Sequence, residues 1–72
     1  MACEIKIELC SPSGREKLVA SIMIDREQMA ELNEEAAELI AEIYPRQDGE
    51  PWVLKYDDLV NSLAKAKYRL GR

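Results

Sequence analysis

The sequence predicts a single α+β domain spanning residues 1–72, with helices packed on one face of a small antiparallel sheet. Three observations support this class: an alternating apolar stretch near the N-terminus, and two later segments in which apolar residues recur at helical spacing. The composition, 47% hydrophobic and 33% charged, is typical of a folded chain. The expected order is a β-hairpin, an amphipathic helix, a short third strand and a C-terminal helix (β-β-α-β-α).

Residues 3–9 show the period-two pattern of a strand with one apolar face, because Cys3, Ile5, Ile7 and Leu9 alternate with charged residues. Residues 11–14 predict a turn, and residues 18–24 predict the second strand of a hairpin. If the turn centres on Ser13 and Gly14, the facing pairs are Leu9 with Leu18, Ile7 with Ala20, Ile5 with Ile22 and Cys3 with Ile24. A bulged turn would allow a register shifted by one residue, which places Val19, Ser21 and Met23 on that face instead.

Residues 25–44 predict the first helix and the element around which the domain is organised. Asp25 is a suitable N-cap with Gln28 three residues later, and Pro45 cannot continue a helix. At about 100° per residue one side of this helix is apolar. It carries Met29, Leu32, Ala36, Leu39, Ile40 and Ile43, flanked by Ala30, Ala37 and Tyr44. The opposite side carries six glutamates, namely Glu27, Glu31, Glu34, Glu35, Glu38 and Glu42.

This acidic side has two interpretations. Charged helix faces are usually only solvated. However, like charges three or four residues apart repel one another, and lysines are absent from this side, so the six glutamates form a candidate surface for a partner protein with a basic patch.

Residues 45–51 contain two prolines and a glycine and predict a loop. Trp52, Leu54 and Tyr56 share one side of residues 52–56, which is consistent with a short edge strand, but an irregular segment that anchors Trp52 in the core has the same pattern. Trp52 is therefore either a core residue or an exposed aromatic anchor for a partner.

The C-terminal helix is expected from Asp57 or Asp58 to Leu70, with Gly71 as a left-handed cap. Its buried stripe is Leu59, Leu63, Ala66 and Leu70. Bases are concentrated at its end, and an alternative function is nucleic-acid binding through Lys65, Lys67, Arg69 and Arg72. The net charge of −4 disfavours this alternative, because an acidic protein repels a polyanion at long range.

The sequence contains no specific motif for catalysis or for binding a metal or cofactor. The chain has no histidine, its two cysteines do not form a CxxC pair, and its three glycines are scattered. In an extended strand Cys3 and Cys10 would lie about 24 Å apart, which is too far for a disulfide. We therefore expect no enzyme activity, no cofactor, no metal site, and a reducing cytoplasmic location, and no apolar run is long enough to cross a bilayer.

These observations favour a small, non-enzymatic, intracellular protein-interaction or regulatory module. A domain of 72 residues is only marginally stabilised by its own core, so burial of further apolar surface in a homodimer is a reasonable expectation. The partner's identity and the biological role are not encoded in any motif of the sequence.

Overall fold

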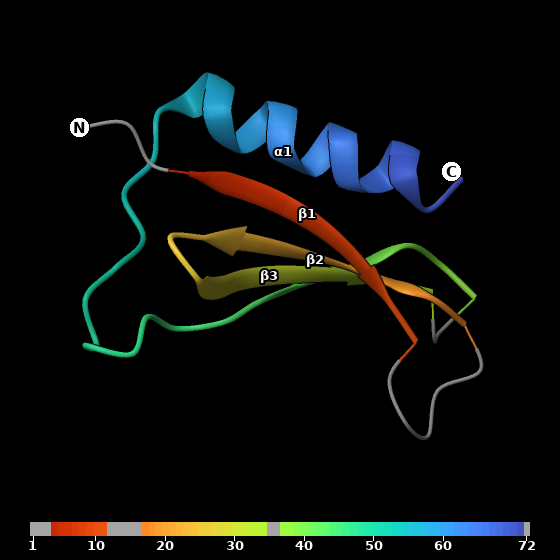
Figure 1. Cartoon of the computed structure of the whole chain (residues 1–72), viewed down its shortest axis with the longest axis horizontal. Coiled ribbons are helices and arrows are strands. Elements are labelled where there is room, and N and C mark those ends of the chain that lie inside the picture. Colours follow the sequence, from red (N-terminus) through yellow and green to blue (C-terminus); the bar gives the residue numbers. More distant parts are fainter. Residues whose placement is uncertain (1–3, 12–16, 35–36, 72) are drawn as a thin grey trace.

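The computed structural model describes residues 4–11, 17–34 and 37–71. Within them it shows a four-stranded antiparallel sheet in the order β1-β2-β3-β4 and a single helix, α1. The elements are β1 (Ile5–Cys10), β2 (Val19–Ile24), β3 (Glu27–Asn33), β4 (Ile40–Ile43) and α1 (Tyr56–Arg69). Helix α1 lies over one face of the sheet and runs along β1 in the same general direction (Figure 1). The α+β class is confirmed, but the predicted order with two helices is wrong.

The N-terminal hairpin is confirmed, in a register two residues away from the one expected for a turn centred on Ser13 and Gly14. Ile7 pairs with Ile22, Leu9 with Ala20 and Ile5 with Ile24. Because a shift of two residues leaves every side chain on the same face, the apolar face of the hairpin is the expected one. The alternative register shifted by one residue is wrong, whereas Cys3 and the turn residues Ser13 and Gly14 lie outside the described residues.

The predicted helix over residues 25–44 is wrong, because β2 turns back directly into β3. Asp25 and Arg26 have φ angles of 50° and 74°, and a two-residue turn with two positive φ angles matches the twist of a hairpin. Asp25 does not cap a helix. Its N–H donates to the Glu4 carbonyl and its carboxylate accepts from the Glu4 N–H, both at 3.0 Å. The chain then forms β4, which pairs with the other edge of β3.

A break in the strand pairing explains why β3 does not show simple alternation in the sequence. The register between β2 and β3 shifts between Ile22 and Met23. Consequently Met29 and Ala30 are consecutive and both buried, which in the sequence looks like part of a helical stripe. Strand β3 also pairs with the second edge of β2. This pairing is needed because β2 is buried, and its backbone groups require a hydrogen-bonded neighbour on each side.

The core lies between the sheet and α1. Ile22, Ala30 and Leu32 form its floor, and Ala66 of the helix is fully buried above them. The half-buried side chains of Leu59, Leu63 and Leu70 pack against the same cluster, so the predicted stripe of the C-terminal helix is confirmed. Gly71 ends the helix with a φ of 84°, and its N–H donates to the Tyr68 carbonyl at 2.9 Å.

Residues 51–55 form no strand and lead irregularly into α1, so the alternative of an irregular anchoring segment is the correct one. Trp52 is half-buried and packs against the core. Its Nε1–H donates to the Tyr44 carbonyl at 2.8 Å, and the Arg46 guanidinium lies 5.4 Å from the ring centroid. Trp52 therefore fixes the connection between β4 and α1 against one end of the core.

Candidate protein-binding edge

Within the described residues, strand β1 is an edge of the sheet, because the strand order gives it a neighbour, β2, on one side only. The hydrogen bond from Asp25 N–H to the Glu4 carbonyl shows that the backbone of Glu4 faces β2. In an antiparallel pair without a bulge the direction alternates residue by residue. The N–H and C=O groups of Ile5, Ile7 and Leu9 therefore point away from β2, toward the open edge.

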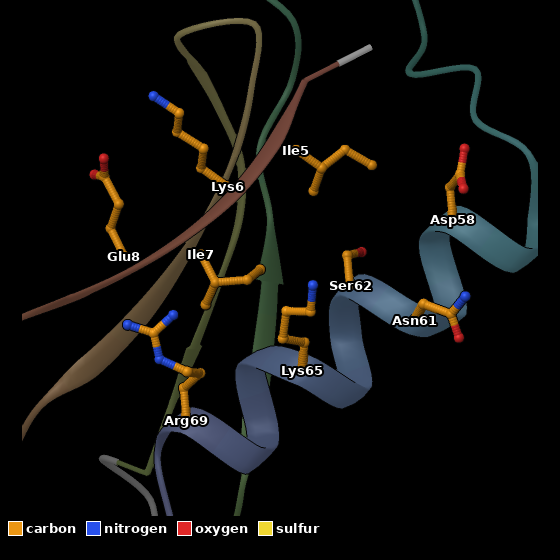
Figure 2. Close-up of a pocket in the computed structure, with 9 residues that line it drawn as sticks. All are labelled: Ile5, Lys6, Ile7, Glu8, Asp58, Asn61, Ser62, Lys65 and Arg69. Atoms are coloured by element: carbon orange, nitrogen blue, oxygen red, sulfur yellow. The ribbon is translucent and has the colours of Figure 1, made fainter. Parts of the chain in front are cut away.

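A groove of about 450 Å³ follows this edge between β1 and α1. Figure 2 shows Ile5 and Ile7 pointing toward the helix, whereas Lys6 and Glu8 lie on the other side of the strand. The lining residues from the helix are Asp58, Asn61, Ser62, Lys65 and Arg69. An extended chain placed against β1 would thus meet backbone groups at its side and helix side chains above it.

The helix presents these residues because they border its buried stripe at helical spacing. Ser62 is itself buried, and its hydroxyl donates to the Leu59 carbonyl at 2.9 Å, so it shapes the wall without offering a free donor. Asp58 lies in the first turn of α1, whereas Arg69 lies in the last. The groove is therefore acidic at one end and basic at the other.

The six glutamates predicted as a partner-binding face do not share a helix face, because that helix is absent. Glu27 and Glu31 belong to β3, Glu42 belongs to β4, and Glu34 and Glu38 lie between these strands. Glu35 lies outside the described residues. Among the five described glutamates, Glu31 and Glu42 are direct neighbours, as cross-strand partners. Binding of a basic protein by these residues stays a prediction without its helical basis.

Glu31 and Glu42 are joined by a buried amide. Asn33 is 2% exposed, and its Nδ2 donates to Glu31 at 3.1 Å and to Glu42 at 2.9 Å. The Tyr44 hydroxyl donates to the second oxygen of Glu42 at 3.1 Å. This network satisfies buried polar groups on the sheet face opposite α1, and the described part of the chain holds no group of three or more side chains suited to bind a metal.

The predicted basic cluster is divided by the structure. Lys65 and Arg69 line the groove together with Asp58, whereas Lys67 is exposed and does not line it. Arg72 lies outside the described residues. Nucleic-acid binding by this cluster remains an untested prediction.

The edge itself, and the roles of Asp58, Asn61 and Ser62 beside it, could not be predicted from the sequence. A polar row next to an apolar stripe is visible in the sequence, but its meaning depends on which strand lies beneath it.

Comparison with models of protein families, with curated proteins and with solved structures found no match in any of the three searches. Across the described residues, no helix is both long and apolar enough to traverse a lipid bilayer. The site must therefore be interpreted from its own geometry.

Proposed function

We propose that the protein is a non-enzymatic interaction module that binds an extended segment of a protein by strand addition at the open edge of β1. The observation that carries this proposal is the outward direction of the backbone groups of Ile5, Ile7 and Leu9 beside a groove. A strand edge of this kind is a template for another chain, since each added residue pair exchanges backbone hydrogen bonds.

The groove supplies selectivity that a bare edge would lack. Alternate side chains of a bound strand would point toward α1, where Ile5 and Ile7 offer apolar contact and Asp58, Lys65 and Arg69 offer charges. The remaining side chains would lie on the opposite face, next to Lys6 and Glu8. A segment with alternating apolar and charged residues therefore fits this edge best.

A proline at Leu9 tests the proposal. Leu9 is 37% exposed and its N–H points to the open edge, so Leu9→Pro removes a donor for an added strand without removing a bond to β2. Leu9→Ala is the matched control, because it shortens the side chain and keeps the N–H. Both variants are checked for an unchanged circular dichroism spectrum.

The protein and the two variants serve as baits for capture of bound proteins, a second copy of the chain included. We expect proteins retained by the unchanged chain and by Leu9→Ala to be lost with Leu9→Pro. Equal retention by all three baits would show that binding does not use this edge.

A further inference from the structure

We propose that the segment bound at the β1 edge is the β1 strand of a second copy of this chain, paired antiparallel about a two-fold axis at Ile7. This inference rests on the proposed function and names its partner. The two sheets would join into one continuous sheet of eight strands with both helices on the same face. Symmetric pairing of identical β1 edges joins two chains and no more at this interface, because each copy has then used its β1 edge.

The backbone directions fit this pairing. With Ile7 opposite Ile7 of the second copy, Ile5 lies opposite Leu9, and all three residues are those whose N–H and C=O groups point to the open edge. Each such pair exchanges two backbone hydrogen bonds in an antiparallel ladder. Lys6 and Glu8 then fall in the pairs without backbone bonds between the copies, where facing side chains lie closest together.

The charges favour this register over the two registers one residue away. With the axis at Ile7, Lys6 of each copy lies opposite Glu8 of the other, which gives two pairs of opposite charge. Moving the axis by one residue places Lys6 opposite Lys6 or Glu8 opposite Glu8, and like charges directly opposite are destabilising. The edge strand IKIEL, residues 5–9, is therefore complementary to itself in the register that also overlaps it completely.

The position of helix α1 is compatible with the same two-fold arrangement. Because α1 runs along β1 in the same general direction, the two-fold axis sets the two helices antiparallel across the groove (Figure 1). Neighbouring strands lie about 4.8 Å apart, so a helix above β1 and β2 and its copy would lie roughly 10 Å apart, a normal helix-packing distance.

Apolar surface supports the same partner. Leu9 is 37% exposed in the single chain although it belongs to the apolar face of the hairpin. In the proposed pairing it lies opposite Ile5 of the second copy, which is itself only half-buried. Both side chains would lose exposed surface, which favours association.

Charge exchange at the edge tests the inference by sedimentation equilibrium over a wide range of protein concentration. Lys6→Glu alone places four glutamates around the axis and Glu8→Lys alone places four lysines, so each variant should dimerise at least about tenfold more weakly. The double variant Lys6→Glu/Glu8→Lys restores two opposite pairs and should dimerise as the unchanged chain does. Equal amounts of the two single variants should form a mixed dimer. Lys6 and Glu8 are exposed, so the variants should remain folded.

Two results would overturn the inference. If the unchanged chain stays monomeric at every concentration, it has no such dimer, while the proposed function survives provided that Leu9→Pro still loses a partner that Leu9→Ala keeps. If the chain dimerises but the single variants dimerise equally well, the dimer uses another surface. Failure of the proposed function is a separate outcome, in which Leu9→Pro neither changes self-association nor releases any other protein.

Discussion

Truncation of Ile22 should cost far more stability than truncation of Leu39, although both changes to alanine remove three carbon atoms. Ile22 is fully buried in the centre of β2, whereas Leu39 is 38% exposed just before β4. Removal of three buried carbons costs about 2.4 kcal/mol of transfer free energy, and the cavity left in the sheet raises the total to about 3–4 kcal/mol. For Leu39 the same estimate, scaled by its buried fraction and without an enclosed cavity, is about 1–1.5 kcal/mol.

Urea denaturation followed by the fluorescence of Trp52, the single tryptophan, measures both changes. If Ile22→Ala does not fold, Ile22→Val gives the same ranking with an expected loss of about 0.5–1.5 kcal/mol against a near-neutral Leu39→Met. The reasoning would be refuted if Leu39→Ala were the more damaging change. That result would favour residues 25–44 as a helix with Leu39 in the core.

Three further outcomes are expected. Ala66→Leu should lower the free energy of unfolding by about 1–3 kcal/mol, because the fully buried Ala66 has no room for growth, whereas Ala64→Leu on the exposed side of α1 should change it by less than about 0.5 kcal/mol in the same urea assay. Arg26→Gly should raise the free energy of unfolding in urea by about 0.5–1 kcal/mol, because Arg26 has a φ of 74° and glycine adopts such an angle without strain. Arg26→Ala should give no such gain. The chain should show no salt-dependent binding to short DNA or RNA in fluorescence titrations, because acids share the groove with Lys65 and Arg69; binding that is lost in Lys65→Gln/Arg69→Gln would instead support the nucleic-acid alternative.

The elements that could be predicted are those whose pattern is local. The period-two alternation of residues 5–9 and the mostly apolar, β-branched run of β2 identified the hairpin, and the stripe from Leu59 to Leu70 identified α1. The side-chain faces of the hairpin were also predicted, because alternate residues of a strand point to opposite faces whatever even number of residues the register shifts by. The exact register was not, since it depends on the conformation of the turn.

Strands β3 and β4 could not be predicted because tertiary pairing overrides local preference there. Residues 25–44 are rich in Ala, Glu and Leu, which favour helices, and the bulge at Met29 hides the strand alternation. The turn at Asp25 and Arg26 contains no glycine, so its two positive φ angles have no sequence signal. Residues 27–33 form a strand because the second edge of β2 needs a hydrogen-bonded neighbour, and a helix at this position could not provide those backbone hydrogen bonds.

The candidate binding edge was missed for a related reason. Lys6 and Glu8 were recognised as the charged, solvent-facing side of a strand. Their opposite charges make two β1 strands complementary to each other, but this matters only if β1 is an edge of the sheet. That fact follows from the order of four strands, and two of the four were assigned to a helix.

Amide hydrogen exchange of β1, measured residue by residue by NMR at several protein concentrations, tests the open edge most directly. The amides of Lys6 and Glu8 face β2 and should be protected at every concentration. Those of Ile5, Ile7 and Leu9 should exchange rapidly in dilute solution and become protected together as the concentration rises and copies associate. Protection of these three amides that is equally high at all dilutions, or that never appears at any concentration or with any partner, would contradict strand addition at β1.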